Sequence, residues 1–297
     1  MVRNGIKSFA GNFMLVWKHL LYNVVIAGVC LALFLWSFEP VVDRLVGSGW
    51  VKELHGFFEV FYTEPSMIAE TFEILATHLY FVLFNDIGSI WGSYAISLFL
   101  LLVLPNFLYN IGEYVLGVLT MSRMTSLLNR SYVSTLISTL GRSTLYSLWK
   151  LLLNIPFFAI LLGVTVGYGL IANNMNGAWL LLPVFVALVL LVLAFRNVFF
   201  IGFLPVAVKG ESSVVKSFAD GMDHYTDGYI KKVLLMWGLF IMEFGAVIMT
   251  ALFTLGAGLI LALPSVIVIN VACSFTNYYA TRKENYYVGE NTIVKPL

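Results

Sequence analysis

Three ionisable residues, Glu113, Arg196 and Glu243, interrupt long apolar stretches of this 297-residue chain. Arg196 comes 13 residues before Lys209, and Glu243 comes 12 residues after Lys231. At 1.5 Å per helical residue, Arg196 and Glu243 lie roughly 18–20 Å from those basic helix ends. Equal depth in neighbouring antiparallel helices predicts an Arg196–Glu243 ion pair. A charge in apolar surroundings needs a partner, so the pair indicates either a substrate or proton path or a purely structural contact.

Amide side chains extend this polar set. Asn106, Asn110 and Glu113 are spaced i, i+4 and i+7, so they line one helix face beside Pro105. Asn154 and Asn270 lie in further apolar stretches. We therefore predict an intramembrane polar seam made of Arg196, Glu243, Glu113, Asn106, Asn110 and Asn154. Two interpretations stay open, a hydrated cavity and a set of interhelical hydrogen bonds that serve packing alone.

Patterns that mark an enzyme or a cofactor site are missing from the sequence. It contains no G-x-x-x-x-G-K-[ST], no H-E-x-x-H and no C-x-x-C. Cys30 and Cys273 both lie in apolar runs, where cysteine is usually a small hydrophobic residue. We expect no catalytic residue, no metal ligand and no cofactor site, and the chain is not predicted to be an enzyme.

The composition indicates that the polar seam lies within membrane-spanning helices. Apolar residues make up 60% of the chain and charged residues only 11%, against about 45–50% and 25% in ordinary soluble domains. A soluble fold of this length could not bury so much apolar surface. No Lys/Arg-rich block is present either, so nucleic acid is not an expected partner. The sequence predicts an all-α integral membrane protein with the lipid bilayer as its main partner.

Six apolar runs are long enough for helices that cross about 30 Å of hydrocarbon. They cover about 18–38, 89–121, 146–172, 178–208, 230–254 and 258–281. The whole chain is predicted to form a single six-helix membrane domain over 1–297.

Orientation follows from the distribution of Lys and Arg. Of the 17 basic residues, 14 lie on one side of the predicted membrane, Lys150 among them, and two on the other. This bias predicts a plasma-membrane protein with both termini in the cytoplasm. It also places His19 and His224 on the cytoplasmic side and His55 and His78 outside, where they cannot share one metal site.

The segment 39–88 is acidic and is predicted to be an extracytoplasmic insertion. It carries eight Asp and Glu residues. After Glu64-Pro65-Ser66, apolar residues at helical spacing predict one amphipathic helix over 67–84. That helix is too polar to span, so we expect it to lie on the outer leaflet or to cap the bundle.

The cytoplasmic connections are themselves predicted to be interfacial amphipathic helices, over 122–143 and 212–225. Ile6-Lys7-Ser8-Phe9-Ala10 is similar to Val215-Lys216-Ser217-Phe218-Ala219. Gly167-Tyr168-Gly169-Leu170-Ile171 is similar to Gly256-Ala257-Gly258-Leu259-Ile260. These matches predict a threefold repeat of interfacial helix, span and span.

A family resemblance rests on the same region. Phe199-Phe200-Ile201-Gly202-Phe203-Leu204-Pro205, then Val215-Lys216-Ser217-Phe218, and the final Asn277-Tyr278-Tyr279 resemble a group of uncharacterised bacterial membrane proteins. The group includes YciC-like proteins and the membrane domain joined to some bacterial glycerophosphodiester phosphodiesterases. The resemblance covers about 195–280 and implies a bacterial six-helix bundle with no catalytic residue to carry over.

Two functions are compatible with these features. The first is a permease-like or transporter-accessory component, which uses the polar seam as a pathway or docks a membrane or cytoplasmic protein through its interfacial helices. The alternative is a structural or lipid-organising membrane protein with no transport pathway.

Overall fold

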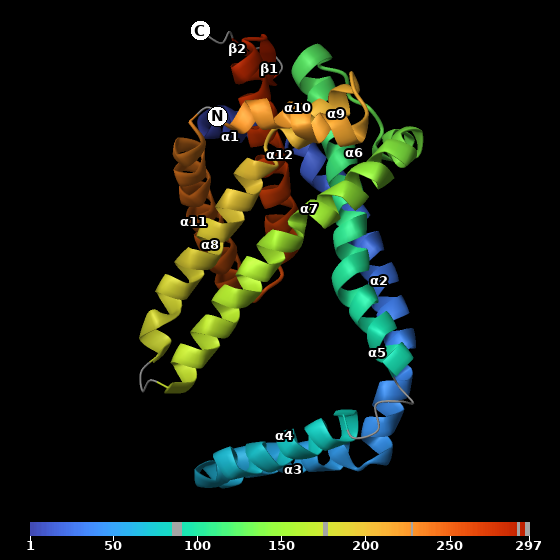
Figure 1. Ribbon diagram of the computed structural model, residues 1–297, viewed down its shortest axis with the longest axis vertical. Coiled ribbons are helices and arrows are strands. Elements are labelled where there is room, and N and C mark those ends of the chain that lie inside the picture. Colours follow the sequence, from blue (N-terminus) through green and yellow to red (C-terminus); the bar gives the residue numbers. More distant parts are fainter. Residues whose placement is uncertain (85–90, 175–177, 227, 290–291, 295–297) are drawn as a thin grey trace. The chain divides into compact units, whose positions relative to one another are not determined.

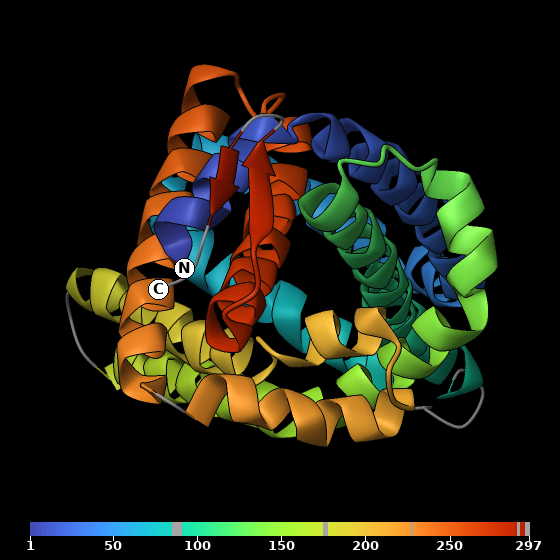
Figure 2. The same ribbon diagram turned by 90° about the horizontal axis from the view of Figure 1, so that it is seen from above.

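A computed structural model describes residues 1–84, 91–174, 178–226, 228–289 and 292–294, and nearly all of them are helical (Figures 1 and 2). The long helices are α2 (Met14–Gly47), α6 (Leu104–Ser126), α7 (Tyr132–Asn174), α8 (Leu182–Phe199), α11 (Tyr229–Phe253) and α12 (Leu259–Arg282). The shorter ones are α1 (Val2–Gly11), α3 (Trp50–Thr63), α4 (Ile68–Phe84), α5 (Trp91–Leu98), α9 (Phe203–Lys209) and α10 (Val214–Thr226). Single 3-10 turns cover Pro65–Met67 and Ala178–Leu181, and a π-helix covers Phe99–Val103. The strands β1 (Tyr286–Gly289) and β2 (Thr292–Val294) pair antiparallel.

Six helical runs in the described residues are long and apolar enough to cross a membrane, as the sequence predicted. They are Met14–Gly47, Gly92–Ser126, Tyr132–Ala172, Leu182–Lys209, Tyr229–Phe253 and Leu259–Arg282. Many of their large apolar side chains face outwards; Leu21, for example, is 68% exposed and Met242 is 60% exposed. Helices satisfy their own backbone hydrogen bonds, so an apolar exterior of this kind is stable in lipid. The chain is a multi-pass membrane protein.

One of the predicted elements is wrong. The segment 122–143 was expected to be a separate interfacial helix, but α6 continues to Ser126 and α7 begins at Tyr132 and runs on into the third span. No proline precedes Pro156 in α7, so nothing in the sequence stops this helix before the membrane. The fourth span, Leu182–Lys209, agrees with the prediction and contains a short break, because α8 ends at Phe199 and α9 begins at Phe203. Residues 89–90 and 175–177, near other predicted boundaries, lie outside the described residues.

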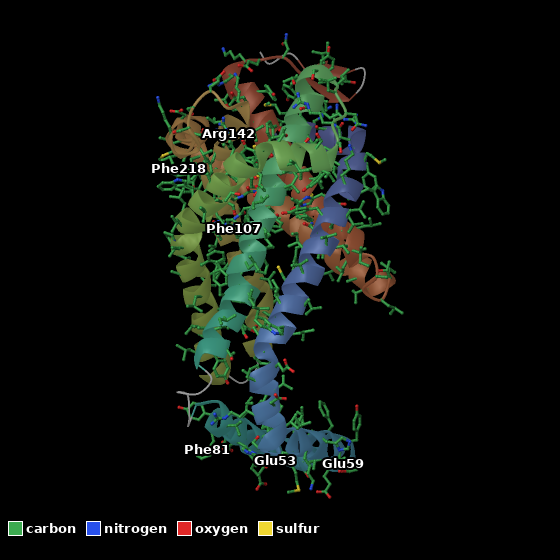
Figure 3. All side chains as sticks on the ribbon, turned by 90° about the vertical axis from the view of Figure 1, so that its right-hand side faces the viewer. Glu53, Glu59, Phe81, Phe107, Arg142 and Phe218 are labelled. Carbon is green, nitrogen blue, oxygen red and sulfur yellow. The ribbon has the colours of Figure 1, made fainter. Side chains whose placement is uncertain are left out.

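The chain divides into two compact units, which are described separately. The insertion unit is Val25–Asn106, and the bundle unit is Met1–Val24 with Phe107–Leu297. In the insertion unit α3 packs along α4, where the sequence predicted only one helix. The Trp50 indole donates to the Leu75 carbonyl at 3.1 Å, and the side chains of His78 and Glu53 meet at 2.6 Å. Figure 3 shows Glu53 and Glu59 on α3 and Phe81 on α4.

The backbone just before Pro105 is irregular. Proline has no N–H to donate to the preceding turn, and the five residues Phe99–Val103 form a π-helix there. Asn106 donates its side-chain amide to the Leu102 carbonyl at 2.7 Å within the same turn. Both residues belong to the insertion unit.

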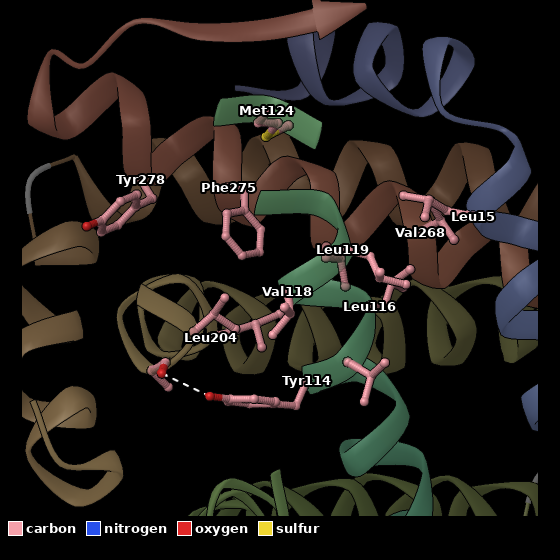
Figure 4. Packing of buried hydrophobic residues seen from close by; sticks show 14 of the residues in the cluster. Leu15, Tyr114, Leu116, Val118, Leu119, Met124, Leu204, Val268, Phe275 and Tyr278 are labelled. Atoms are coloured by element: carbon pink, nitrogen blue, oxygen red, sulfur yellow. Dashed lines mark hydrogen bonds between the residues drawn. The ribbon is translucent and has the colours of Figure 1, made fainter. Parts of the chain in front are cut away.

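The core of the bundle unit is built from apolar side chains of α2, α6, α9 and α12 (Figure 4). Leu116, Leu119 and Phe275 are at most 2% exposed. The Tyr114 hydroxyl donates to the Ala207 carbonyl at 3.1 Å, which ties α6 to α9. Because lipid tails are as apolar as these side chains, close packing and interhelical hydrogen bonds must hold the helices together.

Short elements cover one end of this bundle core (Figures 1 and 2). Helix α1 packs on α12, where a Cβ on Gly5 would lie 2.4 Å from the Cys273 sulfur. Helix α10 packs on α9, where a Cβ on Gly221 would lie 2.8 Å from the Gly202 backbone. The Arg142 side chain (Figure 3) donates to the carbonyls of Ala207 and Ser212, each at 3.1 Å. These contacts hold the short helices against the spans.

The β-hairpin, which the sequence analysis did not anticipate, closes the same end. Tyr286 pairs with Val294 and Tyr287 with Ile293. The Tyr286 ring stacks on Tyr279 with centroids 5.4 Å apart, and its hydroxyl accepts a hydrogen bond from Asn4 at 2.9 Å. The hairpin thereby joins α12 to α1.

Candidate functional site

A cavity of about 420 Å³ lies within the bundle unit, between α6, α7, α8, α11 and α12. Most of its wall is apolar. Its polar lining residues are Tyr109, Glu113, Lys150, Arg196, Asn197, Glu243, Asn270 and Ser274. Three of the predicted seam residues, Glu113, Arg196 and Glu243, therefore line one cavity.

Glu113 is paired with a residue that the sequence analysis had placed elsewhere. Lys150 was counted as cytoplasmic, but it lies inside α7, its side chain is only 7% exposed, and its ammonium group donates to the Glu113 carboxylate. The ammonium nitrogen also lies 5.5 Å from the Tyr146 ring centroid and 5.8 Å from that of Phe200. The two opposite charges compensate one another within the bundle, and the aromatic faces add a further attraction.

Arg196 does not form the predicted ion pair with Glu243. Its Nε donates to the Asn154 side-chain oxygen at 2.6 Å, so its partner lies on α7 and not on α11. Both residues line the same cavity, but Arg196 is directed towards α7. Since Asn154 is neutral, this hydrogen bond positions the guanidinium group without compensating its charge.

Glu243 is a buried carboxylate that no basic side chain among the described residues neutralises. It is 7% exposed on α11; the Asn270 amide lies beside its carboxylate, but within the described structure neither oxygen makes a hydrogen bond of good geometry and no basic side chain pairs with it. A buried carboxylate without partners is costly, because it has lost its hydration and gained nothing in return. It lines the cavity, so a molecule that entered this space would meet it.

The remaining amides of the predicted seam have different positions. Asn154 holds Arg196, whereas Asn110 is buried in α6 and is not part of the cavity wall. Asn106 belongs to the insertion unit and bonds to its own helix, so the expectation that it continues the seam is not supported. Asn197 was not predicted, yet it lines the cavity and donates to Asn270 at 3.3 Å.

A second cavity adjoins the first and is almost wholly apolar. It measures about 340 Å³ and lies between α7, α8 and α11. Its wall includes Phe185, Val186 and Leu161, and it shares Leu190 and Phe244 with the first cavity. The two spaces together offer a polar region and an apolar extension.

His19 was expected on the cytoplasmic side but is fully buried in α2. Its Nδ1 lies 3.3 Å from the Tyr132 hydroxyl, which donates to the Gly112 carbonyl at 3.2 Å. The imidazole is surrounded by Tyr22, Tyr109 and Tyr132. His19 thus packs between α2, α6 and α7.

Comparison with known proteins does not indicate a function for this site. No protein family model, curated protein sequence or solved structure matches the chain. Among the described residues, no three His, Cys, Asp or Glu side chains form a group that could hold a metal ion. The cavity must therefore be interpreted from its own residues, which present one uncompensated cation and one uncompensated carboxylate in apolar surroundings.

Proposed function

We propose that this protein is a permease-like membrane component whose cavity in the bundle unit receives a small-molecule substrate. The observation that carries the proposal is Glu243, a buried carboxylate that lines the cavity and has no partner of opposite charge in the described part of the chain. Ionisable residues inside membrane spans are rare and usually mark substrate or ion pathways. A purely structural carboxylate would be expected to have its oxygens hydrogen-bonded.

The size and lining of the cavity fit this role. Small-molecule sites are commonly about 300–1,000 Å³, mostly apolar, with a few polar groups that orient the ligand. The cavity of about 420 Å³ falls in that range, and Arg196 and Glu243 are its polar groups without a compensating partner charge.

The proposed threefold repeat agrees with a transporter-like architecture, since many transporters are built from internal repeats. Two of the three proposed units begin with a separate short helix, α1 and α10. Equivalent serines in these helices, Ser8 and Ser217, are at most 1% exposed. The equivalent Phe9 and Phe218 both pack on the same core. In the middle unit the corresponding segment is merged into α7.

We also propose the orientation predicted from the basic residues, with both termini in the cytoplasm of a bacterial cell. Removing the buried Lys150 from the count leaves the bias in the same direction. Membership of the YciC-like group is proposed on the residues between 195 and 280 alone.

The alternative function is a structural or lipid-organising protein, and one observation favours it. Glu113 and Lys150 compensate each other completely inside the bundle, as paired charges do when they serve packing. An accessory role, with α1 and α10 contacting a partner protein, would use the same fold without a pathway.

Cysteine accessibility separates the two functions. In a Cys30→Ala, Cys273→Ala background, Ser274→Cys places a thiol on the cavity wall, and Ile241→Cys places one on an outward-facing, 44% exposed position of α11. A pathway predicts that a charged, membrane-impermeant thiol reagent labels the first variant from at least one side and spares the second. If neither thiol reacts while both label after solubilisation and unfolding, the bundle is closed and the permease role is wrong.

A further inference from the structure

The four charges around the cavity do not cancel in pairs. Glu113 and Lys150 neutralise one another directly. Arg196 is held by the neutral amide of Asn154, and Glu243 has only the neutral amide of Asn270 beside it, so neither group has a partner of opposite charge among the residues that the structure describes. They come from different helices, α8 and α11, and do not form an ion pair in the described structure.

A single ligand could compensate both charges if it were itself zwitterionic. An ammonium group would pair with Glu243, and an acidic group such as phosphate would pair with the guanidinium of Arg196, whose planar donors suit phosphate oxygens. A purely cationic or purely anionic ligand would leave one buried charge uncompensated, and a neutral ligand would leave both.

The rest of the ligand is defined by the adjoining apolar cavity. Phe244 follows Glu243 directly on α11 and lines both cavities, and Leu190 on α8 does the same six residues before Arg196. The two charged residues that would hold the head are therefore close in sequence to the two residues that lead into the apolar space. Walls such as Phe185 and Val186 offer contacts to a hydrocarbon chain and none to a polar solute.

We infer that the cavity binds a zwitterionic amphiphile, with its ammonium group at Glu243, its phosphate at Arg196 and a single hydrocarbon chain passing Leu190 and Phe244 into the apolar cavity. The inference rests on the proposed function, because it assumes that the cavity is a ligand site, and it adds the class of ligand.

Competition binding tests the ligand class. The full-length protein in dodecyl maltoside micelles is titrated with radiolabelled lysophosphatidylethanolamine, and three single-chain competitors are compared: sphingosine as the cation, lysophosphatidic acid as the anion and monoacylglycerol as the neutral amphiphile. Each lost charge-assisted contact corresponds to about a tenfold or larger loss of affinity. We expect the zwitterion to bind most tightly and monoacylglycerol to bind at least about a hundredfold more weakly.

Two cavity variants assign the charges. Glu243→Gln should reduce lysophosphatidylethanolamine binding to the level of lysophosphatidic acid, and Arg196→Gln should reduce it to the level of sphingosine. The conservative variants Glu243→Asp and Arg196→Lys keep the charge and should recover part of the preference, which also controls for poor folding. Glu59→Gln and Lys216→Gln change exposed charges away from the cavity and should bind as the unmodified protein does.

Equal affinity for all four amphiphiles, or an unchanged preference in both Gln variants, would overturn the inference. Labelling of the Ser274→Cys variant together with equal affinities would leave the permease role standing and remove this ligand class. A clear zwitterion preference without any labelling of that variant would support the ligand class and overturn the pathway.

Discussion

The buried ion pair between Glu113 and Lys150 allows the electrostatics of the bundle to be tested directly. Their side chains are 15% and 7% exposed, and both belong to helices within predicted spans. Replacing Glu113 with Leu leaves the Lys150 ammonium group buried without a counter-charge. Removing one partner of a buried pair costs about 3–5 kcal/mol.

The aromatic neighbours of Lys150 do not change that difference. Its ammonium group lies 5.5 Å from the Tyr146 ring centroid and 5.8 Å from that of Phe200, and both contacts are present with and without Glu113, so their contribution cancels. We therefore expect Glu113→Leu to lower the free energy of unfolding by about 3–5 kcal/mol. The double variant Glu113→Leu, Lys150→Met should lie within about 1 kcal/mol of the unmodified protein, since apolar replacements of a buried pair are often neutral.

The assay is equilibrium unfolding in mixed micelles, followed by the fraction of protein that retains its native elution position. Lys150→Met alone provides the second edge of the mutant cycle and should destabilise by a similar amount, because it leaves the Glu113 carboxylate buried. Strict additivity, with the double variant as unstable as the sum of the two single variants, would refute the pairing and the charge compensation derived from it.

Three further predictions concern other contacts. Arg196→Leu should lower the folded yield, because Asn154 loses its partner, whereas Glu243→Leu should keep or raise it, because a costly buried carboxylate is removed. The two effects should add when combined, since the side chains do not pair; a Glu243→Leu effect that changes sign in the Arg196→Leu background would show that they do. Gly112→Ala should destabilise the bundle by about 1–3 kcal/mol, since the new Cβ would lie 2.3 Å from the Tyr22 ring, whereas Gly141→Ala, where nothing lies within 4 Å, should be tolerated in the same unfolding assay. Burial raises the pKa of the Tyr286 hydroxyl, so the stabilisation that comes with its neutral form should be complete below the unfolded pKa of about 10 and be lost as the pH rises above it; Tyr286→Phe should remove this dependence from the pH profile of thermal unfolding.

The sequence could predict that Arg196 and Glu243 lie near one another in the bundle, but not how they pair. The rise of a helix per residue is constant, so counting from Lys209 and Lys231 placed Arg196 and Glu243 at one level, and both line the same cavity. Pairing depends in addition on how each helix is rotated about its axis. That rotation is set by packing against all neighbours at once, and here it directs Arg196 to Asn154.

The ends of the helices were harder to predict than the spans, because mild amphipathicity does not distinguish an interfacial helix from the first turns of a spanning one. Segment 212–225 forms α10 by itself, after the left-handed Gly210 that ends α9, whereas 132–143 continues into α7. Lys150 illustrates the consequence: it was counted with the preceding connection although it already lay within the predicted third span. The β-hairpin did carry a local signal, since aromatic and β-branched residues flank Gly289-Glu290-Asn291, but scanning for apolar spans does not detect elements this short.

A partner of opposite charge is the feature that separates the Glu113–Lys150 packing contact from the candidate site at Glu243. A list of intramembrane polar residues treats Glu113 and Glu243 as equals, and both line one cavity. Their partners distinguish them: Lys150 neutralises the first carboxylate, while the second has no basic partner within the described ranges. If both carboxylates served stability alone, each would be expected to have a basic partner, because an unpaired buried charge costs more than an apolar residue of the same size. This difference is the reason for proposing a ligand at Glu243 and not at Glu113, and the adjoining apolar space is the reason for proposing that this ligand carries a hydrocarbon chain.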